Sequence, residues 1–249
     1  IPPLARQLIG EVSVLEDPRP LGNMPRVPAG TPSTFAYDVR ADIGAADVGF
    51  DAIEIFSAAE PLFRDFLVGD PLVSVAPDSL IHGNNSLTLF FPSHRFTTRS
   101  QSNLRIVFES QVFVQSTFFN AQVFDTESDE PSQRVLPGDA NPSVSTNDLR
   151  VLTTAASARN LLPFFEVRPG VVTPNGDGVN DRVAISFTLV QLRRPVQVDV
   201  EVFDVGGRLV RKVFSGLEGS GSFTWDWNGR DDGGKRVPVG IYLARVAVH

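Results

Sequence analysis

The chain has 249 residues, a formal net charge of −7 and no cysteine. The acidic balance argues against a nucleic-acid partner, because phosphate binding needs a basic face. The lack of cysteine excludes disulfides and thiolate metal sites. Hydrophobic residues make up 42% and charged residues 20%, which indicates a packed core. No apolar run reaches the length of a membrane-spanning helix, so we expect no membrane span.

The first 33 residues contain seven prolines, which exclude a helix and any central strand at those positions. We therefore predict that residues 1–33 form an extended N-terminal arm with one strand-like segment, QLIGEVSVLE. One interpretation is a loosely packed leader without a role of its own. The other is an arm that pairs with the sheet edge of a second copy and so links a homo-polymer.

Residues 34–165 are predicted to form a β-sandwich. Apolar and polar residues alternate in the runs TFAYDVRADI, FDAIEIFSA, SLTLFFP, NLRIVFESQVFV and FFNAQVFD, at the spacing typical of a sandwich. Residues 58–67 are predicted to form a single helical turn. The segment 138–149 looks like a dockerin calcium repeat, but Pro142 breaks the ligand spacing, so we predict a turn followed by a strand, with a short helix as the alternative.

Residues 166–249 are predicted to form a second sandwich of immunoglobulin-like size. The run PVQVDVEVFDV alternates with a strict period of two, and Gly206-Gly207 then allows a turn into RLVRKVF. The runs RVAISFTLV, SGSFTWDWNG and IYLARVAV complete the set. The expected fold class is therefore all-β, with two tandem antiparallel β-sandwiches after an extended proline-rich arm.

The loop VVTPNGDGVNDRV carries the strongest local signal in the chain. Closely spaced carboxylate and amide oxygens on a glycine-bent loop suit a hard cation such as calcium. The candidate metal ligands are Asn175, Asp177, Val179, Asn180 and Asp181. The alternative is an Asx-rich turn that satisfies its own backbone, and both interpretations stay open. If calcium binds, we expect it to brace the junction between the two sandwiches.

Three blocks in order, TPNGDGVND, VEVFDVGGRLVRKV and WDWNGRDDGGKRVPVGIYLARV, suggest a family. From about Val171 onward the chain resembles the immunoglobulin-like C-terminal module of flagellar hook-assembly scaffold proteins. It is equally similar to the C-terminal modules of secreted bacterial surface proteins, including those of gliding-motility and type IX sorting systems. The resemblance implies an immunoglobulin-like fold, but such modules occur in many proteins and imply little about function.

We predict no catalytic residue. The histidines His82, His94 and His249 have no metal-ligand spacing, and Asp231 and Asp232 fall on a predicted hairpin tip that is open to water. The residues Trp225 and Trp227 lie on one face of a strand, where they pack in the core or, alternatively, stack on a sugar.

The leading hypothesis is therefore a non-enzymatic, exported bacterial structural or assembly protein, found at the cell surface or in an extracellular filament. Its partners would be further copies of itself, joined through the arm, or other surface proteins. The alternatives are a secretion or anchoring module that sorts a surface protein, and a carbohydrate-binding module in the first sandwich.

Overall fold

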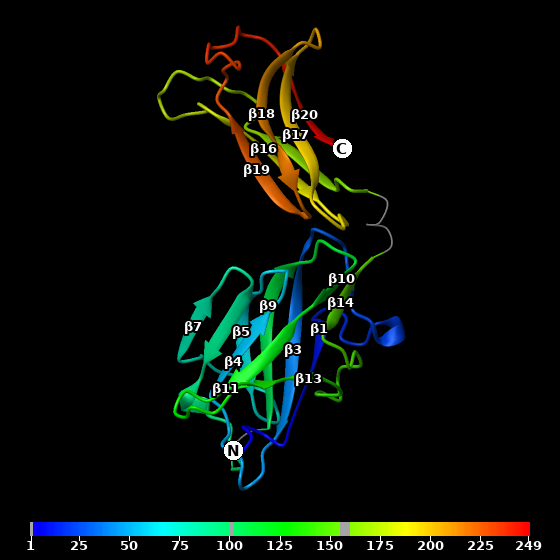
Figure 1. The fold of residues 1–249 in the computed structure, drawn as a ribbon, viewed down its shortest axis with the longest axis vertical. Helices are drawn as coiled ribbons and strands as arrows, with labels where there is room; N and C mark the ends of the chain where they lie inside the picture. Colours follow the sequence, from blue (N-terminus) through cyan, green and yellow to red (C-terminus); the bar gives the residue numbers. More distant parts are fainter. Residues whose placement is uncertain (1, 100–101, 155–159) are drawn as a thin grey trace. The chain divides into compact units, whose positions relative to one another are not determined.

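The structure is a computed structural model that describes residues 2–99, 102–154 and 160–249. The chain divides into unit 1, residues 1–154, and unit 2, residues 155–249, and each unit has its own buried core (Figure 1). In the described part of the chain, strands dominate and helix is limited to two short 3-10 turns, η1 (Leu21–Asn23) and η2 (Pro92–His94). The all-β prediction is confirmed.

Unit 1 contains a sheet in the order β13-β1-β3-β9-β5-β6, a second in the order β12-β11-β4-β8-β7 and a small third sheet, β10-β14-β2. Apart from one parallel pair in the first sheet and one in the third, neighbouring strands are antiparallel. The strands are β1 (Gln7–Val14), β2 (Arg26–Val27), β3 (Pro32–Asp42), β4 (Ala52–Phe56), β5 (Leu62–Val68), β6 (Val73–Ser74), β7 (Ser79–His82), β8 (Ser86–Phe90), β9 (Asn103–Gln111), β10 (Ser116–Phe118), β11 (Asn120–Phe124), β12 (Gln133–Arg134), β13 (Leu136–Pro137) and β14 (Arg150–Thr153).

Phenylalanine rings fill much of the core of unit 1. The rings of Phe35, Phe108 and Phe119 form one group, with centroids 5.1 to 5.6 Å apart. A second group includes Phe50 and Phe96, which stack at 4.9 Å. All five side chains are fully buried. Burial of each ring contributes about 1.5–3 kcal/mol before entropic costs, which accounts for the abundance of phenylalanine.

The N-terminal segment is part of the sandwich, so the prediction of an extended arm over residues 1–33 is wrong. Strand β1 pairs with β3 along its whole length and with β13 on its other side. Leu8 and Val12 are buried in the core. The prolines had suggested an arm, but β1 itself contains none, and those after it lie in its connection to β3 and at the start of β3. Unit 1 therefore begins before residue 34.

Two further sequence predictions concern local structure in unit 1. The helical turn expected at residues 58–67 is wrong, because β5 begins at Leu62 and pairs with β9. The turn and strand expected around residues 138–152 are present, with β14 at Arg150–Thr153. No helix in the described ranges is long and apolar enough to cross a membrane.

Unit 2 contains two three-stranded antiparallel sheets, β15-β16-β19 and β18-β17-β20. Valines from the period-two run of β17 face the core, together with side chains of β16 such as Ile185 and Phe187. Because β15 belongs to unit 2, the second unit begins before the predicted residue 166. The strands are β15 (Phe164–Arg168), β16 (Val183–Leu189), β17 (Val196–Asp204), β18 (Leu209–Glu218), β19 (Gly221–Trp227) and β20 (Tyr242–Val248).

Candidate functional site

Three connections meet at one end of unit 2, which we call the loop end: residues 169–182, 205–208 and 228–241. Because both sheets are antiparallel, β15, β17 and β19 all run toward this end. The register of Arg168 with Ala184 and of Val183 with Trp227 brings the first and third connections together. Two cavities, both lined by Arg182, open at this end.

The predicted metal loop is closed by its own side chains. Asp181 accepts the backbone N–H of Gly176 through Oδ1, at 2.6 Å, and that of Gly178 through Oδ2, at 2.8 Å. Asp177 Oδ1 accepts the N–H of Val179 at 2.7 Å. Both glycines have φ of 86°, a left-handed conformation that side chains disfavour. The loop is thus a set of connected Asx turns.

The remaining candidate ligands are also engaged inside the loop. Asn175 Oδ1 accepts the N–H of Asp177 at 3.1 Å, and its Nδ2 donates to Asp177 Oδ2 at 2.7 Å. The carbonyl oxygens of Val179 and Asn180 accept the hydroxyl and N–H of Thr173. A cation would therefore have to share oxygens that already hold the backbone.

No group of three or more His, Cys, Asp or Glu side chains is placed to hold a metal ion in the part of the chain that the structure describes. The geometry fits the Asx-turn interpretation without help from a metal. Calcium binding at this loop stays a prediction.

The loop belongs to unit 2. It lies within unit 2, between β15 and β16, and β15 separates it from the segment that leads out of unit 1. The expected bracing of the junction between the two sandwiches stays a prediction. Within unit 2 the loop contacts the connection after β19, where a Cβ at Gly229 would lie 2.8 Å from Pro174 Cγ.

The Asp181 carboxyl titrates differently from an ordinary aspartate. The N–H groups of Gly176 and, next, Gly178 hold its pKa below the usual value, because they stabilise the charged form. At the neighbouring turn, the N–H of Arg208 likewise lowers the pKa of Asp204. Both residues are partly exposed and bond to their own loops, so these shifts concern loop closure rather than a buried reactive group.

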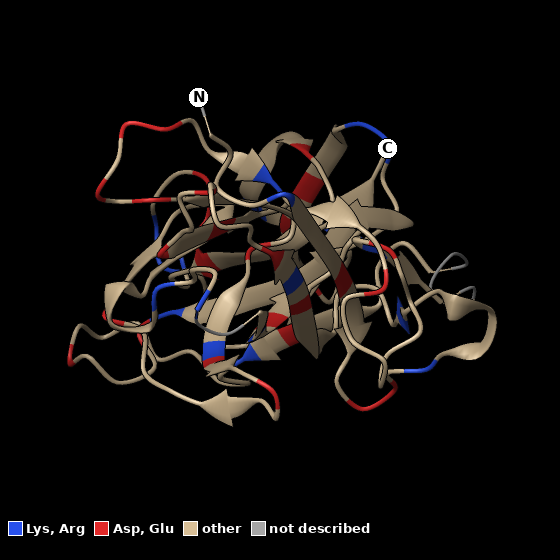
Figure 2. Ribbon diagram, turned by 90° about the horizontal axis from the view of Figure 1, so that it is seen from below, with Lys and Arg blue, Asp and Glu red and all other residues tan. Residues whose placement is uncertain are grey.

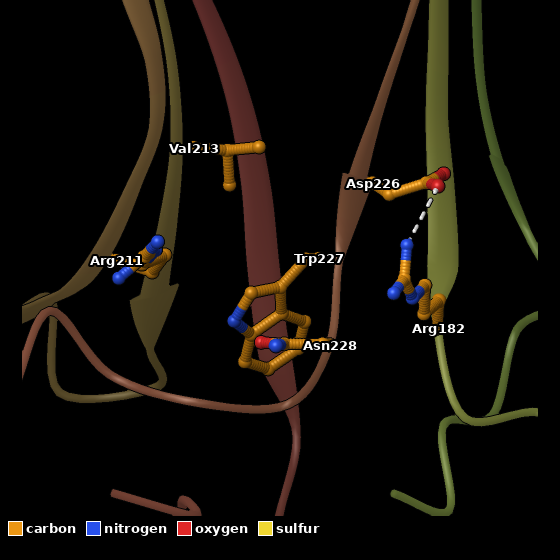
Figure 3. Close-up of a pocket in the computed structure, with 6 residues that line it drawn as sticks. All are labelled: Arg182, Arg211, Val213, Asp226, Trp227 and Asn228. Atoms are coloured by element: carbon orange, nitrogen blue, oxygen red, sulfur yellow. Dashed lines mark ion pairs between the residues drawn. The ribbon is translucent and has the colours of Figure 1, made fainter. Parts of the chain in front are cut away.

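A cavity of about 170 Å³ opens at the loop end (Figure 3). Arg182 and Asp226 lie on one side of it and Arg211 on the other, with Trp227 and Asn228 between them. Arg182 also lines a second, more open cavity beside Gly178, Asn180 and Asp181. We call these two adjoining spaces the arginine cleft.

The tryptophans do not form an exposed platform. Trp227 is 5% exposed, packs edge-on against Tyr242 and donates its Nε1–H to the carbonyl of Arg230. Trp225 stacks on Phe214 with ring centroids 4.0 Å apart. The structure therefore shows the core-packing alternative rather than sugar stacking.

Sequence analysis missed a buried carboxylate in unit 1. Glu11 is fully buried, and its Oε1 accepts the N–H groups of Ala140 and Asn141, each at 3.0 Å. Its Oε2 accepts the N–H and hydroxyl of Thr146 and the N–H of Asn147. The available signal was a lone acidic residue inside an apolar strand.

A second missed feature is a pair of buried carboxylates around one guanidinium. Arg95 contacts Asp51, at 3.3 Å, and Asp125. The hydrogen bond from Arg95 holds the pKa of Asp125 below its usual value. Asp51 also accepts the N–H and hydroxyl of Thr126, at 2.8 and 2.7 Å. The arrangement is structural, because every partner belongs to the framework around it.

The fold and loops of unit 2 define an immunoglobulin-like β-sandwich. Residues 177–249 match the FlgD Ig-like domain, which confirms the resemblance to the flagellar hook-assembly module. The matched region covers strands β16 to β20 and part of the Asx-turn loop, whereas unit 1 lies outside it. No curated protein matches the chain.

Several solved structures show distant similarity. Dimeric latent PorU from Porphyromonas gingivalis is 14% identical over 90% of this chain and 17% of its own, with a TM-score of 0.31. The pilus backbone protein RrgB from Streptococcus pneumoniae is 10% identical over 90% and 48%, with a TM-score of 0.34. Domains D2 and D3 of the pilin SpaD from Corynebacterium diphtheriae are 11% identical over 93% and 79%, with a TM-score of 0.35. The chain thus spans less than half of the first two proteins, and scores of this size carry no argument about function.

Proposed function

We propose that the chain is a non-catalytic structural protein of an exported bacterial assembly, at the cell surface or in an extracellular filament. One observation carries the proposal: the five buried carboxylates in the described part of the chain all have structural partners. They are Glu11, Asp38, Asp51, Asp125 and Glu201. Catalytic acids and bases are instead buried groups that face a substrate cavity. Two sandwiches with separate cores suit a load-bearing or spacing role.

A second candidate function is a sorting or anchoring address in unit 2. The match to the FlgD Ig-like domain favours it, because that match is confined to residues 177–249. In this case an export or anchoring machinery would recognise unit 2, and unit 1 would perform the function at the cell surface.

The two proposals are tested by labelling intact cells of the source bacterium with an antibody against unit 1. A surface role predicts labelling without permeabilisation, and labelling only after permeabilisation would contradict it. The sorting function predicts that a chain without residues 155–249 stays inside the cell. Normal surface labelling of that truncated chain would leave only the structural function.

A further inference from the structure

Strand β20 presents an open hydrogen-bonding edge. The order β18-β17-β20 places it at the margin of its sheet (Figure 1). The N–H of His249 donates to the carbonyl of Gln197 at 2.9 Å, which fixes the residues of β20 that bond to β17. These residues are Leu243, Arg245 and Ala247. The residues that direct their N–H and C=O groups away from the sheet are Ala244, Val246 and Val248. No backbone hydrogen bond between described residues uses these outward groups.

The other sheet margins in the described part of the chain are short, irregular or covered. In unit 1 the marginal strands β2, β6, β12 and β13 have two residues each, β10 has three and β7 has four. In unit 2, β18 contains two register shifts and contacts β19, and β15 has five residues and is followed by Pro169. Such features keep strand edges from pairing with another chain. Strand β20 has seven residues in regular register and no proline, so it lacks them.

The core face of unit 2 is exposed on the side where β20 lies. Ala244 and Val246 pack against the core, whereas Val248, on the same face of β20, is 36% exposed. On β15, Phe165 shares a face with Val167, which packs against the core, yet Phe165 is 43% exposed. Because β18 and β19 contact each other on the opposite side, β15 and β20 border the open side of the sandwich. A further strand beside β20 would continue the sheet and cover Val248.

The open edge also indicates what kind of partner it accepts. Acidic and basic residues are interspersed along strands and loops (Figure 2), so net charge does not select the partner. Strand addition needs a free strand edge with apolar side chains on its inner face. Strand β20 itself meets both requirements. A two-fold contact between two copies therefore satisfies two open edges at once, whereas a bound peptide would satisfy one.

The side chains of β20 select one antiparallel register for such a contact. With Val246 opposite Val246 of the second copy, the small Ala244 lies opposite the exposed Val248, and Arg245 lies opposite Ala247. A register centred on Arg245 instead places two like charges directly opposite each other, which is destabilising. A register centred on Ala244 leaves Val248 without an opposite residue in the strand. The register centred on Val246 is therefore the favoured one.

We propose that β20 of one copy pairs with β20 of a second copy, antiparallel and centred on Val246, so that their two sheets become one continuous sheet. This inference rests on the proposed structural function and adds a contact between copies. The same strand contributes on both sides, so the contact closes at two chains. It joins molecules in pairs and does not by itself extend a filament.

Substitutions of Ala247 test the pairing and its register. Ala247→Lys places a like charge opposite Arg245 of the second copy, twice in each dimer, whereas Ala247→Glu places an opposite charge there. Within one copy, Ala247 pairs with Asp199 of β17, so the lysine favours the fold and the glutamate disfavours it. Loss of association in the lysine variant is therefore not explained by unfolding. The matched control is Leu217→Lys, at an exposed position of β18 on the other margin of the sheet.

Sedimentation equilibrium of the 249-residue chain measures association, and thermal unfolding confirms the fold of each variant. We expect a concentration-dependent dimer for the wild type and for Leu217→Lys. Association should be at least about tenfold weaker for Ala247→Lys and no weaker for Ala247→Glu. Val246→Pro should abolish the dimer, because it removes an N–H that points to the second copy and leaves the bonds to β17 in place.

Amide hydrogen exchange followed by NMR locates the contact. The N–H groups of Arg245 and Ala247 bond to β17 and should exchange slowly at every protein concentration. Those of Ala244 and Val246 should become protected only at concentrations where the dimer forms. A contact through side chains alone would not produce this alternation, so its absence from a dimer would contradict strand pairing.

Three further results would overturn the contact. They are a monomer at every concentration, dimers that Ala247→Lys and Val246→Pro leave intact, and an equal loss in Leu217→Lys. A synthetic peptide of alternating valine and threonine is the probe for another occupant. If it protects the N–H of Val246 in a chain that stays monomeric, the edge receives an extended peptide and pairing of two copies is wrong. Surface labelling of cells does not depend on this contact, so its failure and failure of the proposed function are distinguishable.

Discussion

Glu11 and Thr146 meet inside unit 1 although 135 positions separate them. Oε2 of Glu11 accepts both the N–H and the hydroxyl of Thr146, each at 3.1 Å. With the other three donors, this makes one carboxylate the common acceptor for both ends of the segment between β13 and β14. A buried charge is tolerated here because five donors replace its water.

We predict that Glu11→Ala lowers the free energy of unfolding by about 3 kcal/mol or more, because four N–H groups and a hydroxyl lose their buried acceptor. Glu11→Gln should also destabilise unit 1. One of the two accepting oxygens becomes an NH₂ group, which cannot accept hydrogen bonds from the N–H groups that face it. Urea unfolding measures the loss. Limited proteolysis should show faster cleavage between residues 139 and 147. The exposed Glu16→Gln is the control, and an equal loss there would contradict the assignment.

The second prediction concerns Arg95. Arg95→Met should destabilise unit 1 by about 3–5 kcal/mol, because Asp51 and Asp125 stay buried without their counter-charge. The matched control is Arg64→Met, which removes a half-exposed ion pair with Glu109 and should cost about 0–1 kcal/mol. Denaturant unfolding measures the free energy of unfolding of both variants. Similar losses of free energy in the two would refute the structural importance of the Arg95 cluster.

A third prediction follows from the contact between Gly229 and Pro174. Gly229→Ala should destabilise unit 2 by about 1–3 kcal/mol, because the residue has φ of 67° and its new Cβ would meet the proline ring. Gly234→Ala provides a matched control, since φ there is 78° but nothing lies within 4 Å. The difference between the two variants in thermal unfolding isolates the contact. No difference would mean that the two connections do not pack.

The Asx-turn loop should respond to acid. The pKa of Asp181 is lowered by the N–H groups of Gly176 and Gly178, so the folded loop binds a proton less readily than the unfolded chain. Its stabilising effect is present above the ordinary aspartate value of about pH 4 and is lost as pH falls through the lowered pKa. We expect Asp181→Asn to melt earlier at pH 7 and to show a smaller additional loss toward pH 2.5. If the melting temperatures of variant and wild type fall by equal amounts between pH 7 and pH 2.5, the proposed role of the Asp181 carboxylate is wrong.

The fifth prediction concerns the effect of calcium on stability. Because the loop oxygens already accept hydrogen bonds within the loop, the Asx-turn interpretation predicts that a chelator leaves thermal unfolding unchanged. A calcium-dependent rise in melting temperature that Asp177→Asn abolishes would instead establish the site, since a ligand that binds the folded state stabilises it by mass action.

The strands of unit 2 were predictable because their local pattern and their burial agree. The valines at every second position of β17 face the core, as the alternation requires. The role of β1 was not predictable in the same way. Its partners β3 and β13 are set by tertiary pairing, and the prolines that suggested an arm fall outside it.

The candidate site was predictable only in part. The spacing of Asn175, Asp177 and Asp181 identifies an oxygen-rich turn, but sequence alone cannot say whether those oxygens face a cation or the backbone. The sequence also suggested that this loop marks the start of the second unit. Strand β15 precedes the loop and already belongs to unit 2. The arginine cleft joins Arg182 with Arg211 from a different sheet, and only the folded sandwich brings such residues together.

The placement of β1 has a consequence for the order in which unit 1 folds. Its strand partner β13 and the amides that receive Glu11 are encoded more than 120 residues after it. In a chain synthesised from its N-terminus, β1 can therefore pair with β3 early, whereas its second partner β13 and the donors of Glu11 are complete only after residue 147 has appeared. The buried carboxylate of Glu11 thus lacks its protein donors until nearly all of unit 1 has been made.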